Sequence, residues 1–146
     1  MDQGAIAYSV HGKILGRFDP PGGAGAVYGT DLDGDGPNEV LTLGTTEVSG
    51  LKLSVFSAGG KMRWSVKVGE VGGFVKAPIF VFKLNGRRVI GVAGGRGVRF
   101  YSTTGKEVGR ISLLITAAAR LPGIGNTDHL LLRGNGFLGC YGVNEK

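Results

Sequence analysis

VRFYSTTGKEVGRI, residues 98–111, carries an aromatic residue four positions before a Gly-Lys pair, and this arrangement recurs along the chain. Two further full copies are AIAYSVHGKILGRF (5–18) and LSVFSAGGKMRWSV (53–66), and LGCYGVNEK (138–146) begins a fourth. In each full copy a glycine ends the loop between two strand-like segments, where a positive φ is favourable only without a Cβ. The chain is therefore predicted to repeat a β-hairpin.

A second recurring element lies upstream of the last three hairpins. It consists of the apolar runs Val40–Gly44, Val89–Gly94 and Leu130–Gly134, which are typical of buried strands. A further candidate strand precedes each run, at about 25–30, 74–82 and 115–121. The aligned aromatic residues are 48, 45 and 40 positions apart. Four short strands in every such step are the signature of a β-propeller blade.

We therefore predict an all-β chain, a partial β-propeller of about three four-stranded antiparallel blades in one domain over 1–146. Its repeat units are the end of a blade at about 5–18 and further units at 25–68, 74–114 and 115–146. The alternative is a β-sandwich or open barrel, which uses similar short strands but needs no such self-similarity. The alanines of ISLLITAAAR (111–120) would suit a short helix, but we interpret this segment as an outer strand leading into the next inner strand.

Composition agrees with a soluble globular domain of many turns. The 146 residues are 42% hydrophobic and 19% charged, and they include 29 glycines and one cysteine. No apolar run approaches the roughly 20 residues of a membrane span, and no signal peptide is visible, so a cytoplasmic location is expected. The single cysteine, Cys140, fits a reducing compartment and is predicted to be a small core residue.

The most distinctive chemistry lies in TDLDGDGPNEVLTLG, residues 30–44. Counting from Asp31, carboxylates fall at positions 1, 3, 5 and 9 and a glycine at position 6. Hard oxygen ligands at this spacing suit calcium, and Pro37 at position 7 offers a backbone carbonyl. An EF-hand is excluded, because position 12 is Thr42 within a strand-like run. The alternative is a solvated turn whose Asp side chains accept bonds from their own backbone.

This loop resembles the calcium loop of FG-GAP propeller repeats of the integrin α-subunit type, D-x-(D/N)-G-D-G-x-x-D. The hairpins FSAGGKMRW (56–64) and YSTTGKEVGR (101–110) are also similar to those of PQQ-like propeller repeats. The resemblance implies a bound Ca²⁺ with four side-chain ligands and one carbonyl ligand, namely Asp31, Asp33, Asp35, Glu39 and the carbonyl of Pro37. Glu39 stands where the repeat usually has aspartate. The connections KLNGRR (83–88) and PGIGNTDH (122–129) lack this carboxylate set.

Other motifs favour no catalytic site. His11 and His129 have no neighbouring metal-ligand or catalytic pattern, and no phosphate-binding or dinucleotide fingerprint is present. The aromatic residues at repeat positions are predicted to pack between blades rather than to stack on a ligand; these are Tyr8, Phe18, Phe56, Trp64 and Tyr101. We therefore expect no enzyme activity.

Charge is unevenly distributed along the sequence. Residues 48–127 contain thirteen lysines and arginines against two glutamates, a net charge of +11 within a chain whose total is +6. Such a field favours an acidic partner, which could be an acidic protein surface, nucleic acid or an anionic glycan, or else it marks a solvated rim. Base-reading motifs are absent, so nucleic acid would be bound through its phosphates.

Three functions remain open. The first is a calcium-binding, protein-binding module that completes a propeller ring, and the second is a polyanion-binding module that uses residues 48–127. The third, suggested only by the PQQ-like hairpins, is a redox propeller that holds a quinone. Thirteen expected strands make little more than three blades, whereas propellers typically close with 4 to 8. We therefore expect a homodimer or an obligate heteromeric complex, with contacts concentrated at residues 1–18 and 130–146.

Overall fold

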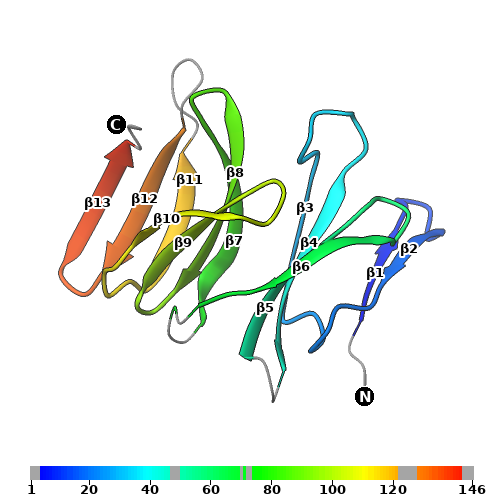
Figure 1. Cartoon of the computed structure of the whole chain (residues 1–146), viewed down its shortest axis with the longest axis horizontal. Helices are drawn as coiled ribbons and strands as arrows, with labels where there is room; N and C mark the ends of the chain where they lie inside the picture. The colour runs from blue at the N-terminus through cyan, green and yellow to red at the C-terminus, as the bar shows by residue number, and fades with distance from the viewer. Residues whose placement is uncertain (1–3, 47–49, 70, 72–73, 122–127, 143–146) are drawn as a thin grey trace. The chain divides into compact units, whose positions relative to one another are not determined.

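The computed structural model describes residues 4–46, 50–69, 71, 74–121 and 128–142, and within them the secondary structure is thirteen β-strands without a helix (Figure 1). In the same residues there is accordingly no helix that could span a membrane. The chain divides into two compact units, residues 1–69 and 70–146. Each unit is built from antiparallel neighbours along the sequence, as repeated hairpins require.

The first unit contains a two-stranded hairpin and a four-stranded antiparallel sheet in sequential order. The hairpin is β1 (Ala5–Tyr8) with β2 (Ile14–Phe18), and the sheet is β3 (Ala26–Thr30), β4 (Glu39–Thr46), β5 (Gly50–Phe56) and β6 (Met62–Lys67). Consecutive residues of β5, from Leu53 to Phe56, are all buried, so both faces of this sheet are covered. On one face the ring of Phe56 meets that of Phe18 edge to face, with centroids 5.7 Å apart.

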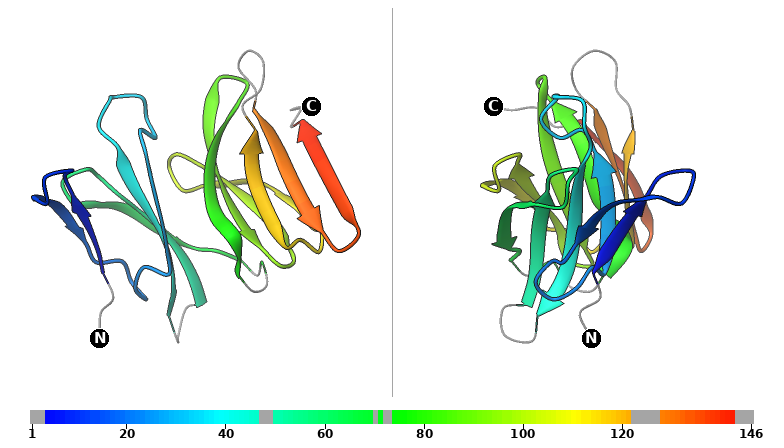
Figure 2. Two further views of the ribbon diagram at one scale, coloured as in Figure 1. Left: turned by 180° about the vertical axis from the view of Figure 1, so that it is seen from behind. Right: turned by 90° about the vertical axis from the view of Figure 1, so that its right-hand side faces the viewer.

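The second unit contains a sheet of seven strands in the order β10-β9-β8-β7-β11-β12-β13. Its first four strands in sequence are β7 (Phe74–Leu84), β8 (Arg87–Gly94), β9 (Gly97–Ser102) and β10 (Glu107–Ile111). The remaining three are β11 (Ala117–Leu121), β12 (His129–Gly134) and β13 (Phe137–Gly142). A single parallel pairing, Ala117 with Lys76, joins β11 to β7. Figure 2 shows the same strands from two further directions.

The core of the second unit lies between strands β7–β10 and strands β11–β13. Phe82 and Phe100 from β7 and β9 pack edge to face at 5.6 Å, and they belong to one buried cluster with Ala118, Leu130 and Leu132 from β11 and β12. Aromatic pairs in this geometry stabilise a core beyond their buried area. The two apolar runs of this unit that were predicted to be buried strands, 89–94 and 130–134, therefore contribute to the core.

Two glycines that end such runs are required by close backbone approach. A Cβ at Gly44 would collide with the carbonyl oxygen of Gly23, and one at Gly94 would collide with that of Val71. Since neither position tolerates a side chain, the glycine at the end of the second strand is a packing feature of the repeat.

The predicted all-β architecture with four-stranded antiparallel blades is confirmed, since β3–β6 form such a sheet and β7–β10 are four sequential antiparallel strands within the seven-stranded sheet. In the segment 111–120, β10 ends at Ile111 and β11 begins at Ala117, so an outer strand does lead into the next strand, through a connection at 112–116 that is neither strand nor helix. Two core predictions are wrong: Cys140 is exposed, and Tyr8 is 56% exposed. Phe18, Phe56 and Tyr101 are buried as expected, and Trp64 is half-buried. The single domain over 1–146 stays a prediction.

Candidate functional site

The acidic loop connects β3 to β4, because Thr30 ends one strand and Glu39 begins the next. Gly34 and Gly36 adopt positive φ values of 86° and 104°, which allow the chain to curl tightly. Leu32 lies among the acidic residues and is only 2% exposed, so it anchors the loop to the sheet. Backbone bonds to the side chains fix the curl further: Asp31 Oδ1 accepts from Gly34 N at 2.6 Å.

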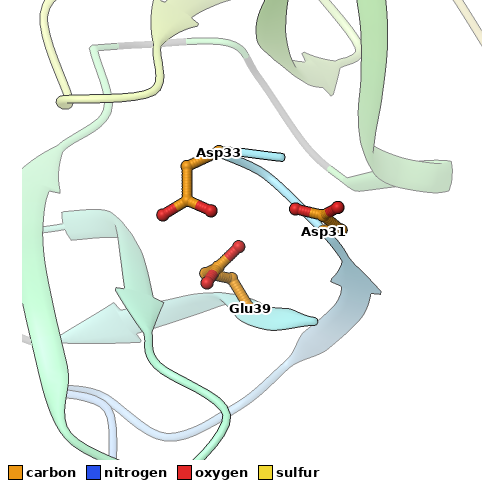
Figure 3. A group of neighbouring side chains, drawn as sticks. All are labelled: Asp31, Asp33 and Glu39. Carbon is orange, nitrogen blue, oxygen red and sulfur yellow. The ribbon is translucent and has the colours of Figure 1, made fainter. Parts of the chain in front are cut away.

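Three of the predicted ligands come together. Asp31, Asp33 and Glu39 each place a carboxylate oxygen within 4.8 Å of the others, and Figure 3 shows these side chains directed toward one another. Asp35 lies outside this group, and both Asp35 and Pro37 are exposed. The structure therefore assembles three of the four carboxylates that the sequence singled out.

Glu39 is the buried member of the group, with 1% of its surface exposed. Its Oε2 accepts a hydrogen bond from Leu32 N at 2.7 Å, and its Oε1 lies 2.9 Å from Arg63 NH2. Because a buried carboxylate needs partners for its charge, these two contacts explain how Glu39 is accommodated at the first position of β4.

Arg63 of β6 is the residue of the site that sequence reasoning missed. Its NH1 donates to Asp33 Oδ2 at 2.6 Å while its NH2 contacts Glu39, so the guanidinium bridges two of the three carboxylates. In a sequential antiparallel sheet the β3–β4 loop and the β5–β6 turn lie at the same end, which is the signal that could have identified this partner. The site thus contains a positive charge of its own.

The charges of the loop shift the pKa values of its members. The hydrogen bond from Arg63 lowers the pKa of Asp33, and the same bond raises the pKa of Arg63. Desolvation in the loop, followed by repulsion from Asp33, raises the pKa of Asp35. Asp33 also accepts a hydrogen bond from Asp35 N at 3.2 Å, the Asx type of bond expected for a curled acidic turn.

The donor set fits a hard divalent cation. Carboxylate oxygens are the ligands that calcium prefers, and three of them converge here from one loop and the strand that follows it. The guanidinium of Arg63 contacts the same carboxylates, so a metal ion and Arg63 would compete for Asp33 and Glu39. The site can therefore bind a cation through its convergent carboxylate oxygens, but that cation would have to displace the Arg63 guanidinium.

The β11–β12 connection corresponds to the β3–β4 loop in the repeat, but its buried carboxylate is bound by protein groups. Asp128, immediately before β12, is 6% exposed; its Oδ2 accepts from Lys83 N at 2.7 Å and pairs with Arg120 at 2.9 Å. A lone buried carboxylate is thereby satisfied by the backbone of β7 and an arginine of β11. Among the described residues, Asp31, Asp33 and Glu39 form the one acidic or metal-ligating group of three or more.

The basic region places like charges opposite one another on adjacent strands. The register pairs Lys52 with Lys67 and, in the second unit, Lys83 with Arg88 and Arg99 with Arg110. Arg99 also forms two hydrogen bonds with Glu107, at 2.9 and 3.1 Å. Directly opposed like charges destabilise a sheet unless a counter-charge lies near, so these positions favour an anionic neighbour.

Comparison with known proteins identifies the fold. No protein-family model matches the chain, and no curated protein does. The solved structures that match include two of BBS1N in complex with ARL6DN, one soaked with mercury and one with lead. Each is 18% identical with a TM-score of 0.67; they cover 96% and 95% of this chain, which spans only 44% and 43% of theirs.

These structural neighbours are β-propellers. Together with the four-stranded antiparallel blades, the similarity defines this chain as part of a β-propeller. The likeness concerns the fold, and membership of the FG-GAP repeats stays a prediction from the loop sequence.

Proposed function

We propose that this chain is a non-catalytic β-propeller segment that acts as a protein-binding and assembly module, completing a ring with another copy or another subunit. The observation that carries the proposal is that two groups of strands among the described residues have fewer than the four strands of a blade. β1 and β2 form a sheet of two strands, and β11–β13 add three strands where the other blades have four. Open sheet edges and uncovered blade faces are sites where another chain can pair or pack.

The structural neighbours are compatible with this proposal. Their names describe BBS1N in complex with a second protein, ARL6DN. That association is a property of those proteins. It supports a protein-interaction role for this chain as one example of the same fold binding another protein.

We further propose that the acidic loop binds Ca²⁺ and so stabilises the first unit. Asp31, Asp33 and Glu39 supply the converging oxygens, and in this proposal Asp35 and the carbonyl of Pro37, both on the exposed part of the loop, are the further ligands. A cation that binds the folded loop and not the unfolded chain raises stability by mass action. The ion is a brace for the blade in this proposal, not a catalytic centre.

A polyanion-binding role through residues 48–127 is the second candidate, favoured by the opposed basic pairs described above. The two roles differ in salt dependence, because binding to a nucleic-acid backbone releases counterions and therefore weakens steeply as the salt concentration rises. Affinity for duplex or single-stranded nucleic acid that persists at physiological salt would support the second role.

Native mass spectrometry together with light scattering tests the assembly role. We expect a dimer or, with a partner subunit present, a defined heteromer. A folded monomer that associates with neither itself nor another chain contradicts the proposal.

A further inference from the structure

Strand β13 is the open edge of the group formed by β11, β12 and β13. It pairs with β12 along six residues, Phe137–Gly142, and in the described part of the chain no strand pairs with its other edge. The strands at the same repeat position, β5 and β9, are paired on both edges. β5 lies between β4 and β6, and β9 lies between β8 and β10. The repeat itself therefore shows what fits beside β13, which is one antiparallel strand.

The edge of β13 lacks the features that normally prevent strand pairing. Its sequence, FLGCYG, contains no charge and no proline, its register with β12 is continuous, and Leu138 is 70% exposed. The outer strands of the complete blades differ. β6 carries Arg63 and Lys67, β10 carries Glu107 and Arg110, and each has a register shift. Charges and bulges of this kind protect sheet edges, so β6 and β10 are protected and β13 is not.

We propose that β13 pairs antiparallel with β13 of a second copy of this chain, about a two-fold axis, so that one sheet runs through both copies. The inference rests on the proposed assembly function and names the surface that serves it. A two-fold interface brings the same patch of both copies together, so a charged strand would face its own charges. An uncharged strand avoids that repulsion, even in a chain whose total charge is +6.

The choice of a second copy over an unrelated strand also follows from charge. In the complete blade of the second unit, the outer strand is matched to its neighbour by the ion pair of Glu107 with Arg99. β13 offers no charged residue with which a charged donor strand could pair. The strand that suits it is therefore uncharged and extended, as β13 is.

Sedimentation equilibrium over a concentration series, with Leu138→Lys and a control, tests the proposal. We expect the unmodified chain to dimerise and Leu138→Lys to weaken dimerisation at least tenfold, or about 1.4 kcal/mol. The control is Val108→Lys, which adds the same charge at a 54% exposed apolar position on β10 and should leave dimerisation unchanged.

Hydrogen exchange of the unmodified chain provides a measurement that needs no variant to fold. Amides of β13 should become more protected as concentration rises, while those of β10 should not. A dimer that Leu138→Lys leaves intact and whose β13 amides gain no protection overturns this inference, while assembly through another surface stands. A folded monomer at every concentration overturns both this inference and self-assembly.

Discussion

Replacing Glu39 with alanine should destabilise the first unit even when no metal is present. Glu39 is 1% exposed and accepts a 2.7 Å hydrogen bond from the backbone N–H of Leu32, itself 2% exposed. Alanine removes the acceptor and leaves that N–H buried without a partner. The contact with Arg63 adds less, since the Arg63 side chain is 35% exposed and its charge is screened by solvent.

The expected magnitude follows from the orphaned donor. Leaving a buried donor unsatisfied costs about 1–3 kcal/mol, so we expect Glu39→Ala to lower the free energy of unfolding by about 2 kcal/mol. Glu39→Gln keeps an oxygen for Leu32 N and should cost under about 1 kcal/mol. Glu107→Ala removes a partner from an ion pair whose carboxylate is 38% exposed, and it should cost about 0–1 kcal/mol.

Urea unfolding in the presence of a chelator measures the free energy of unfolding of these three variants without a contribution from calcium. With a slope of about 1–2 kcal/mol/M, a loss of about 2 kcal/mol moves the midpoint by roughly 1–2 M. If Glu39→Gln costs as much as Glu39→Ala, or if Glu39→Ala is no worse than Glu107→Ala, the hydrogen bond to Leu32 is not the reason for the buried glutamate.

Three further predictions concern binding. Calcium should raise the melting temperature and Asp33→Ala should largely abolish the effect; calorimetry without binding heat and a melting temperature unchanged by chelation would contradict the site. Arg63→Ala should bind calcium several-fold more tightly in titration calorimetry, because the guanidinium no longer occupies Asp33 and Glu39, and an unchanged affinity would exclude competition. Reversing the charges of Arg87 and Arg88 should weaken binding to an acidic protein or polyanion and flatten its salt dependence, whereas an unaltered salt slope would remove this surface from the contact.

The strand order was predictable because it depends on local sequence. An aromatic residue before a Gly-Lys turn, repeated at steps of 48 and 45 residues, identifies each hairpin without reference to distant contacts. The convergence of Asp31, Asp33 and Glu39 was likewise predictable, since those residues belong to one loop and the start of the next strand. Short-range spacing is sufficient for both.

The partners from other strands were not predictable in the same way. Arg63 and Asp33 are 30 positions apart in the sequence, and Lys83 and Asp128 are 45 apart. Each contact therefore depends on which strands lie side by side in the folded sheet. Glu39 is almost fully buried while Asp35 is exposed, and this difference was not predictable from the sequence because both are acidic residues of the same motif and their burial depends on how the folded loop places each side chain.

The wrong core predictions share one physical cause, and it bears on assembly. Tyr8 occupies the repeat position of Phe56 and Tyr101, but β1 has only β2 beside it, whereas β5 and β9 have a strand on each edge. A repeat position predicts burial only where the neighbouring strands are present, and the same holds for Cys140 on β13. The predicted core residues that are exposed therefore lie on β1 and β13, which have a paired strand on one edge only.

Exposed apolar side chains follow the same distribution. Six of the eleven large exposed hydrophobic residues found in the described chain lie within residues 1–18 and 130–146, namely Ile6, Tyr8, Val10, Ile14, Leu15 and Leu138. Burying apolar surface stabilises an association by about 25 cal/mol per Å², so the largest share of the exposed apolar surface available to a partner lies at residues 1–18, with Leu138 adding to it on β13. A partner that covered only the protected outer strands β6 and β10 would gain little of it. For this reason we expect assembly to involve β1–β2 and β13 rather than the outer strands of the complete blades.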